Sequence, residues 1–545
     1  MTRTLFTIGL IACFAQPLVA QVTFERLLHA ADEPQNWLTY SGNYDSNRHT
    51  PLEQITTENV DSLELQWVFQ AQSLQVFETT PLVVDGIMYL TEAPNTVVAL
   101  DAAHGRVFWR YEYTPSNLSR PCCGRVNRGV AILGDTLFMG TIDAKLIAID
   151  AISGEPIWQT DVADAEAGYA LTLSPLIVKD KVIVGIAGGE YGIRGFISAY
   201  DVNTGEEAWK FYTIPGPGEP GHETWQDDDW MYGGASAWIT GSYDPDTDLV
   251  YWGIGNPGPD WNPEQRPGDN LYSDSVVALN PDTGELEWYF QFTPNDPYDY
   301  DAVQVPVLVD YPAQDGSMLK LMLFGNRNGF FYILDRATGR FINGEPYIDL
   351  NWAEGLDDVG RPIFTPQPPG TTTYPGVQGG TNWYSPSYSP STRLFYMSTW
   401  EGNGSNFEAQ EAEYEPGRTF LGGRPAPPVP GAALPNLARG PINTWTESAG
   451  TGAVKALDPA TGEERWKFPM TDVTTSGILT TATDVLFTGG REGYFHALDA
   501  RTGDLLWKQT LGGMIANGPI SYSIDGHQYV AAASGNALFV FALEQ

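Results

Sequence analysis

Cysteine and positive charge are both scarce in this sequence. Three cysteines in 545 residues are too few for a disulfide scaffold, and no C-x-x-C or C-x-x-C-H occurs. A cysteine-rich zinc site and covalent haem attachment are therefore excluded. Only 29 lysines and arginines face 67 aspartates and glutamates, which gives a net charge of −38. The negative electrostatic field of such a protein repels phosphates and therefore disfavours nucleic-acid binding. It keeps a protein soluble or steers a cationic partner protein toward it.

Long apolar runs are lacking beyond the first twenty residues. Arg3, followed by the uncharged stretch from Leu5 to Ala20, predicts a signal peptide over 1–20 that is cleaved near Ala20. A lipoprotein box ending at Cys13 is the alternative for this segment. No other apolar run is long enough to cross a bilayer. We therefore expect the mature chain, 21–545, to have no transmembrane segment and to lie in the periplasm, where a disulfide can persist.

Glycine, proline and aromatic residues are by contrast plentiful. The 58 glycines and 40 prolines interrupt helices too often for a helical bundle. Aromatic residues make up 12% of the chain, and they bury enough surface to exclude general disorder. Many short strands joined by tight turns fit this composition best.

One motif recurs through the chain: Asp or Asn, then Gly four residues later and Trp eight residues later. Each copy follows an alternating apolar stretch that predicts a strand. The Asp side chain caps a tight turn, Gly supplies a positive φ, and Trp opens the next strand. A worn copy at Asp335 has Asn343 in place of Trp. The six full copies begin at Asp101, Asp150, Asp201, Asn280, Asp458 and Asp499.

The spacing of these copies predicts an all-β, eight-bladed β-propeller with Trp-docking motifs. Most copies lie 41 to 55 residues apart, which is the length of a four-stranded blade. The seven copies close seven blades. Trp67 lies on a strand without its own blade, and the chain after Trp507 offers three strands without a closing Trp. Pairing these N- and C-terminal strands in one blade gives the eighth and closes the ring.

Two spacings are longer, at 79 and 123 residues. The second holds a Pro- and Gly-rich excursion over 401–441, which we interpret as an inserted loop. Insertions in a propeller usually gather on the face that carries the site. We therefore expect a single propeller domain over 21–545, with these insertions as walls of the site.

Unusual residues cluster between the predicted strands. Cys122 and Cys123 are adjacent, and they are either two buried thiols or a vicinal disulfide. An exported chain without other mature cysteines favours the disulfide. Oxygen donors stand in Gly- and Pro-rich segments of different blades: Glu190, Asn256, Asp299 and Asp301. Carboxylate and amide oxygens of this kind suit a hard cation such as Ca²⁺.

These segments resemble a known family. The motifs are the Trp-docking repeats and the segments CCGRVNRG, GGEYGIRG, GIGNPGPDWN, TPNDPYDYDAV and QGGTNW. The order of these motifs resembles that of the pyrroloquinoline quinone (PQQ)-dependent alcohol dehydrogenases, which are methanol dehydrogenase-like quinoproteins. The resemblance covers about residues 35–545. It implies an eight-bladed propeller that oxidises an alcohol by hydride transfer to metal-bound PQQ. Tyr298 departs from the Trp of the family's W-D-Y segment, and Ala187 departs from a common hydroxyl residue.

The resemblance also implies roles for individual residues. Asp299 would be the catalytic base, and the metal ligands would be Glu190, Asn256, Asp299 and Asp301. The flat cofactor would lie between the indole of Trp238 and a disulfide of Cys122 with Cys123. Trp261 would shape the substrate pocket. The remaining cofactor-binding residues would be Glu78, Arg128, Thr172, Gly188, Gly189, Ser236, Arg327, Asn382 and Trp383.

Asp301 bears on the identity of the metal. Family members that resemble the lanthanide enzymes have Asp two residues after the catalytic aspartate, whereas those that resemble the calcium enzymes do not. One more carboxylate balances a trivalent ion better, so we favour a lanthanide over Ca²⁺. A solvent-facing Asp301 beside a calcium site is the alternative.

Electrons must leave the reduced cofactor. Because no C-x-x-C-H is present, we expect a separate soluble cytochrome c as the acceptor, steered by the acidic surface. Two other interpretations stay open: a non-enzymatic scaffold like the propellers of outer-membrane assembly, or a PQQ dehydrogenase for a sugar, a polymeric alcohol or an aldehyde instead of a small alcohol. The sequence leaves the oligomeric state open, a homodimer included.

Overall fold

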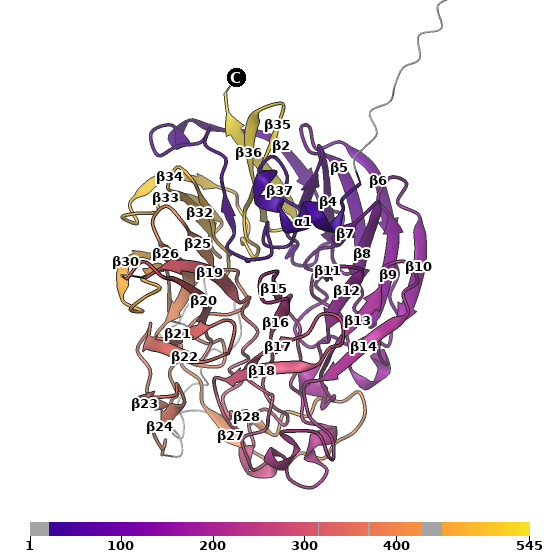
Figure 1. Ribbon diagram of the computed structural model, residues 1–545, viewed down its shortest axis with the longest axis vertical. Helices are drawn as coiled ribbons and strands as arrows, with labels where there is room; N and C mark the ends of the chain where they lie inside the picture. Colours follow the sequence, from indigo (N-terminus) through magenta and orange to yellow (C-terminus); the bar gives the residue numbers. More distant parts are fainter. Residues whose placement is uncertain (1–20, 314, 369–370, 427–449, 545) are drawn as a thin grey trace, which may run out of the picture.

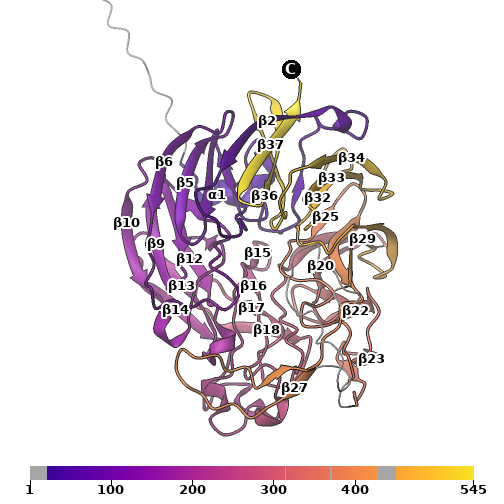
Figure 2. The same ribbon diagram turned by 180° about the vertical axis from the view of Figure 1, so that it is seen from behind.

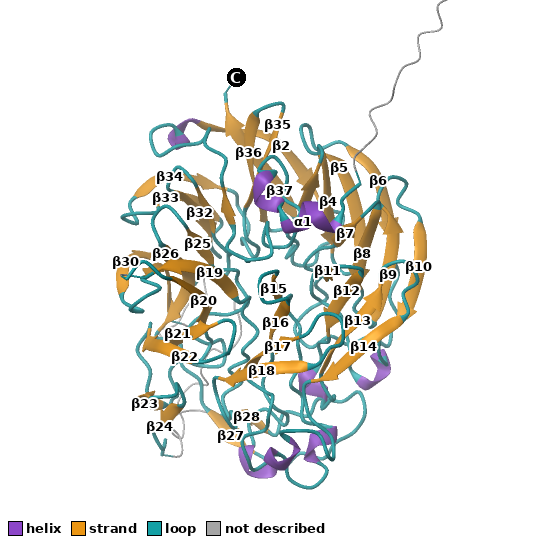
Figure 3. Ribbon diagram, in the orientation of Figure 1, coloured by secondary structure: helices purple, strands orange, loops and turns teal. Residues whose placement is uncertain are grey.

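The computed structural model describes residues 21–313, 315–368, 371–426 and 450–544. Within them, eight sheets of strands surround a central axis like blades of a propeller (Figures 1 and 2), and helices are few and short (Figure 3). The predicted eight-bladed all-β fold is thereby confirmed. The predicted signal peptide over 1–20, and the lipoprotein alternative at Cys13, lie outside the described residues.

Each of the first five sheets is a meander of four consecutive antiparallel strands. Their bounds are β3 (Leu82–Val84), β4 (Ile87–Glu92), β5 (Thr96–Asp101), β6 (Val107–Glu112); β7 (Ala131–Leu133), β8 (Thr136–Gly140), β9 (Lys145–Asp150), β10 (Pro156–Asp161); β11 (Leu176–Val178), β12 (Lys181–Gly185), β13 (Phe196–Asp201), β14 (Glu207–Tyr212); β15 (Ser242–Asp244), β16 (Leu249–Gly253), β17 (Ser275–Leu279), β18 (Leu286–Gln291); β19 (Val307–Pro312), β20 (Met318–Gly325), β21 (Phe330–Asp335) and β22 (Phe341–Pro346).

The last three sheets complete the ring. They consist of β25 (Ser387–Ser389), β26 (Leu394–Glu401), β29 (Thr451–Leu457), β30 (Glu464–Pro469); β31 (Leu479–Thr481), β32 (Val485–Gly489), β33 (Tyr494–Asp499), β34 (Leu505–Thr510); and β35 (Ile520–Ile524), β36 (His527–Ser534), β37 (Ala537–Leu543) with β2 (Leu63–Gln70). Strand β1 (His49–Thr50) pairs parallel with β31 and makes that sheet five-stranded. Outside the blades lie α1 (Phe24–Leu28), the hairpin β23 (Ala353–Leu356) with β24 (Pro362–Phe364), and the hairpin β27 (Phe407–Ala409) with β28 (Gly423–Pro425).

The ring closes as the sequence predicts. Strand β2 from the N-terminal region pairs antiparallel with β37 from the C-terminal region, in a register that joins Leu63 to Leu543. Trp67 on β2 then lies against Gly105 in the next blade. Closure removes the two exposed sheet edges that an open ring would leave.

The Asp-Gly-Trp motif joins each blade to the next. Gly154 has φ +75, and a Cβ built on it would lie 2.7 Å from the ring of Trp109 in the preceding blade. The indole nitrogen of Trp109 donates to the Ala151 carbonyl in that same turn at 3.2 Å. In the worn copy Asn343 keeps this function, because its amide donates to the Thr461 carbonyl at 2.9 Å. Only a residue without a side chain fits beneath the indole, so the turn residue is Gly.

The apolar core lies between neighbouring blades. Leu90, Phe495 and Val540 belong to one fully buried cluster although they come from three different sheets. Fully buried aliphatic side chains of this size each contribute about 1.5–3 kcal/mol. The core therefore stabilises the ring as a whole rather than single blades.

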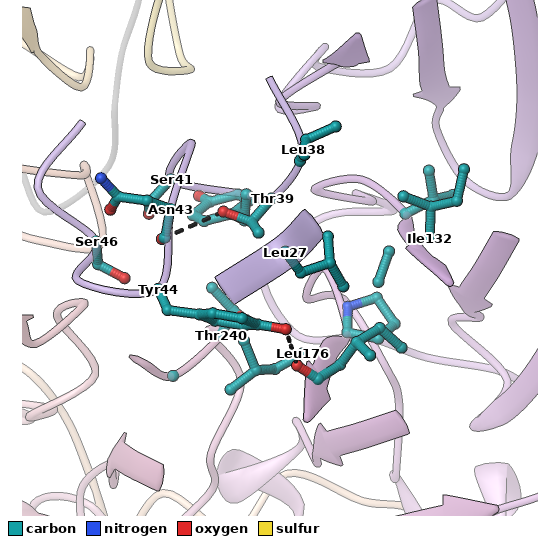
Figure 4. A pocket seen from close by; sticks show the side chains of 16 residues that line it. Leu27, Leu38, Thr39, Ser41, Asn43, Tyr44, Ser46, Ile132, Leu176 and Thr240 are labelled. Carbon is teal, nitrogen blue, oxygen red and sulfur yellow. Dashed lines mark hydrogen bonds between the residues drawn. The ribbon is translucent and has the colours of Figure 1, made fainter. Parts of the chain in front are cut away.

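A segment before β2 threads the axis. Residues 44–48 bond to the first, innermost strands of four blades: the carbonyls of Tyr44, Asp45, Asn47 and Arg48 accept from β15, β19, β25 and β31. Tyr44 Oη also donates to the Ile177 carbonyl of β11 (Figure 4). The cavity beside Tyr44 and Leu27 is only about 20 Å³, which is room for little more than a water molecule.

The two long insertions pack against each other. Trp261 from the first stacks on Phe407 from the second with ring centroids 3.9 Å apart, and Tyr232 stacks on Tyr414 at 3.8 Å. The second insertion also reaches a site segment, because the Phe420 amide donates to the Glu190 carbonyl at 2.7 Å. Of the predicted excursion 401–441, residues 427–441 lie outside the described residues.

Candidate active site

Two kinds of loop build the candidate site. In an antiparallel blade, the loop that enters the first strand and the loop that leaves the second lie at the same end. Loops of the second kind carry Glu190, Asn256 and Arg327. Loops of the first kind carry Glu78, Cys122, Cys123, Arg128, Thr172, Ser236, Trp238, Asp299, Asp301, Asn382 and Trp383. The propeller thus brings residues from six blades to one end of the axis.

These loops surround a cavity of about 390 Å³. Pockets for organic cofactors commonly have this size. The predicted residues that line it are Glu78, Cys122, Cys123, Arg128, Thr172, Gly188, Glu190, Trp238, Asp299, Asp301, Arg327, Asn382 and Trp383. Three further predicted residues lie directly behind the wall: a Cβ on Gly189 would lie 3.3 Å from Ser236 Oγ and 3.9 Å from Asn256 Oδ1.

Two flat groups form walls of this cavity. A disulfide joins Cys122 to Cys123, and Sγ of Cys122 lies 2.8 Å from Glu190 Oε1. Because both sulfurs are oxidised, neither is a thiolate that could ligate a metal beside Glu190. The indole of Trp238 forms another wall, and its Nε1 donates to Asp301 Oδ2 at 3.3 Å.

A buried arginine marks the polar side of the cavity. Arg128 pairs with Glu78 at 2.7 Å, and its guanidinium lies over Trp383 at 4.5 Å and over Trp238 at 5.1 Å. Its Nε is buried and has no hydrogen-bond acceptor, and the same holds for Nε of Arg327. Two guanidinium groups in the lining of a cavity of this size fit a planar, polyanionic ligand such as PQQ.

Three of the predicted metal ligands, Asn256, Asp299 and Asp301, lie together beside Arg327, whereas the carboxylate of the fourth, Glu190, lies against the sulfurs of Cys122 and Cys123. Asp301 Oδ1 accepts from the backbone N–H of Asn256 at 2.9 Å, and Oδ2 accepts from Arg327 Nη1 at 2.5 Å. Arg327 Nη2 lies 3.7 Å from Asp299 Oδ2. Asp299 itself has φ +64, a left-handed conformation that turns its carboxylate toward this group.

The electrostatics of this cluster favour a cation. Burial raises the pKa of Glu190 to about 7, against the opposing effect of a backbone hydrogen bond. Burial also raises the pKa of Asp299 well above its usual range, Arg327 opposes this shift, and the Asp301 charge adds to it. One guanidinium cannot balance three carboxylates in a buried site. A bound cation would balance these carboxylates, so the residues present fit the metal that the sequence motifs imply.

The comparisons with known proteins decide the family. Residues 37–344 match the family model described as glucose/ethanol/alcohol dehydrogenase, beta-propeller domain. The chain belongs to the PQQ-dependent alcohol dehydrogenases. It is 37% identical to the quinoprotein alcohol dehydrogenase PedH of Pseudomonas putida, over 98% of this chain and 92% of that protein. It is 36% identical to the lanthanide-dependent methanol dehydrogenase of Methylacidiphilum fumariolicum, over 94% of this chain and 86% of that one.

Solved structures agree with this assignment. A europium-containing methanol dehydrogenase superposes with a TM-score of 0.86 at 33% identity, covering 95% of this chain and 100% of that one. The quinohemoprotein alcohol dehydrogenase ADHIIG of Pseudomonas putida gives a TM-score of 0.89 at 33% identity, with 96% and 83% covered. Residues 450–544 also match the model of the outer membrane protein assembly factor BamB. That match concerns the last blades alone, so the dehydrogenase family takes precedence over the scaffold alternative.

One predicted pocket residue lies beside the main cavity of this alcohol dehydrogenase. Trp261 lines a neighbouring space of about 290 Å³, together with Tyr298, Val377 and Phe407. The two cavities adjoin, because Tyr298 precedes Asp299 in the chain and the Val377 carbonyl accepts from Arg327 Nη2. Trp261 is therefore placed to contact the approach to Asp299 rather than the cofactor space.

Sequence reasoning missed several buried charged residues next to the site. Asp260, Asp274 and Asp296 are at most 2% exposed, and Arg266 is fully buried. Burial raises the pKa of Asp296 to about 6. Position offers a signal for two of them, since Asp260 follows Asn256 by four residues and Asp296 precedes Asp299 by three. Asp274 carries no such signal, because it stands at the start of an ordinary apolar strand.

Proposed function

We propose that this dehydrogenase oxidises a small alcohol to an aldehyde or ketone in the periplasm, using PQQ and one lanthanide ion. The observation that carries the proposal is that Glu190, Asp299 and Asp301 line one cavity with the disulfide and Trp238, while Asn256 bonds to Asp301 directly behind its wall. When bound, PQQ supplies the hydride acceptor and the cation polarises its carbonyl. Periplasmic location rests on the signal-peptide pattern in 1–20.

The chain's own residues supply a base and hold it in place. Asp299 accepts the hydroxyl proton of the alcohol, because burial makes its carboxylate a stronger base than an exposed aspartate. Arg327 holds this carboxylate at 3.7 Å and holds Asp301 at 2.5 Å, which fixes both relative to the cavity. Trp238 and the disulfide orient a flat ligand and exclude water from its faces.

The adjoining cavity offers apolar walls to the chain of an alcohol. Its lining includes Trp261, Tyr298, Val377 and Phe407, and Trp261 stacks on Phe407. Aromatic and aliphatic walls stabilise an alkyl or aryl chain by burial. The same lining also offers polar partners, which are Gln367, Thr371, Thr373, Ser405 and Asn406.

Reconstitution tests the proposal. Apoprotein is supplied with PQQ and either La³⁺ or Ca²⁺, and dye-linked oxidation of primary alcohols and sugars is measured. We expect activity with La³⁺ on apolar alcohols, and its loss in Asp301→Ala but not in the exposed control Asp315→Ala. Equal activity with Ca²⁺, retained in Asp301→Ala, would contradict the lanthanide assignment. Inactivity of the wild type with either metal, without PQQ retained on the protein, would contradict the function itself.

The electron acceptor in this proposal is a separate soluble cytochrome c. The net charge of −38 should attract a basic cytochrome over distances beyond direct contact. The bimolecular rate of reoxidation should therefore fall steeply between about 10 mM and 150 mM salt, as the Debye length shrinks from about 30 to 8 Å. A rate unaffected by salt would rule out electrostatic steering.

A further inference from the structure

Asp296 lies three residues before the proposed base Asp299, in the loop between β18 and β19. Its side chain is fully buried. Both carboxylate oxygens accept a backbone hydrogen bond: Oδ1 accepts from the N–H of Tyr298 at 2.8 Å, and Oδ2 accepts from the N–H of Tyr300 at 2.6 Å. One carboxylate therefore bonds to the chain on both sides of Asp299.

Asp299 depends on its surroundings for its conformation. Its φ of +64 lies in the left-handed region, which is unfavourable for a residue with a Cβ atom and persists only where neighbouring contacts impose it. The two bonds to Asp296 fix the backbone one residue before Asp299 and directly after it. Without these bonds, the backbone of Asp299 could turn toward the right-handed region, and its carboxylate would then turn away from Arg327.

The turn over 296–300 is anchored at both ends to other parts of the site. The fully buried Arg266 donates from Nη2 to the Asp296 carbonyl, and from Nε to the Pro259 carbonyl at 3.0 Å in the loop between β16 and β17. At the other end, Tyr300 Oη donates to the Pro375 carbonyl at 2.5 Å. Because both ends are fixed, the carboxylate of Asp296 controls the conformation of the three residues between them.

Asp296 is not among the described residues that line either cavity. Its carboxylate oxygens face backbone N–H groups instead. An effect of Asp296 on alcohol oxidation would therefore pass through the position of Asp299, and not through contact with a ligand.

We propose that Asp296 is a positioning residue for Asp299, because its carboxylate clamps the turn over 296–300 and directs the base into the cavity. This inference rests on the proposed function, since it takes Asp299 as the base. A displacement of a reacting group by about 1 Å costs on the order of 100-fold in rate. Loss of the clamp should therefore lower kcat, whereas the binding of alcohol and PQQ should persist.

The test compares Asp296→Asn with Asp201→Asn. In the Asp201 turn a single oxygen, Oδ1, accepts from the N–H groups of Asn203 and Thr204, at 2.9 Å each. The amide oxygen of Asn280 accepts two N–H groups in the same way in the next copy of the motif, so Asp201→Asn should keep its turn. Asp296→Asn cannot keep both bonds, because they use two oxygens and an amide has only one.

Hydrogen–deuterium exchange of the metal-free protein tests the clamp without any activity. In Asp296→Asn, the peptide that holds Tyr298 and Tyr300 should exchange at least about tenfold faster than in wild type, because one of these N–H groups loses its acceptor. The same peptide should exchange at the wild-type rate in Asp201→Asn. An unchanged rate in Asp296→Asn would overturn the clamp.

Steady-state kinetics of the protein reconstituted with PQQ and La³⁺ test its consequence. We expect Asp296→Asn to lower kcat for a primary alcohol at least about tenfold, with KM and PQQ retention within about twofold of wild type, and Asp201→Asn to change neither. Asp296→Glu keeps the charge but moves the carboxylate by one methylene group, so its kcat should fall as well. A wild-type kcat in Asp296→Glu would mean that charge and not geometry matters, which overturns the positioning role.

The outcomes distinguish the two proposals. An active wild type with full kcat in Asp296→Asn overturns the role of Asp296 and leaves the proposed function standing. A wild type that oxidises no alcohol and retains no PQQ overturns the proposed function and, with it, the role of Asp296 in catalysis.

Discussion

Substituting the glycine beneath a docking tryptophan tests whether the motif joins the blades. Gly205 has φ +71, and a Cβ built on it would lie 2.6 Å from the Trp158 ring. Gly526 is a matched control, because its φ is +80 and no atom lies within 4 Å of its built Cβ. Alanine at either position meets the same unfavourable backbone conformation, whereas only alanine at 205 meets an indole.

The magnitudes follow from these two differences. A left-handed backbone costs alanine about 1–2 kcal/mol, which applies to both variants. Forcing a methyl group into a packed contact costs about 1–3 kcal/mol more, which applies to Gly205→Ala alone. With an unfolding entropy near 2.1 cal/mol/K per residue, 1 kcal/mol shifts the Tm of this 545-residue chain by about 1 °C.

The assay is differential scanning calorimetry with urea unfolding as a second probe. We expect Gly205→Ala to melt below Gly526→Ala by about 1–3 °C, with a correspondingly lower urea midpoint. A shift for Gly205→Ala that equals the shift for Gly526→Ala would refute the reasoning, because the indole contact would then contribute nothing to the packing of neighbouring blades.

The remaining predictions concern the site and its surroundings. In Gly255→Ala the new methyl group would overlap Asp301 Oδ1, so we expect loss of alcohol oxidation with an unchanged circular dichroism spectrum, and no loss in the unobstructed Gly512→Ala. Arg128→Met removes a buried guanidinium at the cavity wall and should weaken PQQ binding at least about tenfold, measured by equilibrium dialysis; unchanged retention of PQQ would contradict its role. Burial lowers the pKa of His496 to about 4 from a usual 6.5. Below pH 6.5 the unfolded chain therefore takes up a proton that the folded protein resists, and by pH 5 about 2 kcal/mol of stability is lost. His496→Gln should remove that part of the acid sensitivity in urea titrations, and a parallel pH profile for the variant would count against the assignment.

Local patterns were enough to predict the architecture. The Asp-Gly-Trp motif specifies a turn and the opening of a strand within nine residues, and its repetition counts the blades. Even the worn copy at Asp335 joins its blade to the next, because the side-chain amide of Asn343 donates the hydrogen bond that the Trp indole supplies elsewhere. The pairing of β2 with β37 was also predictable. The N-terminal region has a strand with a docking Trp but no blade of its own, and the C-terminal region has three strands without that Trp. The family motifs likewise pointed to Asp299 and its neighbours residue by residue.

Only the tertiary structure decided which of these residues meet and what else lies among them. Glu78 and Trp383 are some three hundred residues apart and share one cavity because the ring closes. The buried Asp260 and Asp274 give no periodic or compositional signal, since a single aspartate in a loop or strand is usually exposed. Their burial depends on how loops from separate blades pack, as do the path of residues 44–48 along the axis and the contact of Trp261 with Phe407. Sequence patterns report interactions between near neighbours in the chain, whereas the charge balance of this site results from long-range packing.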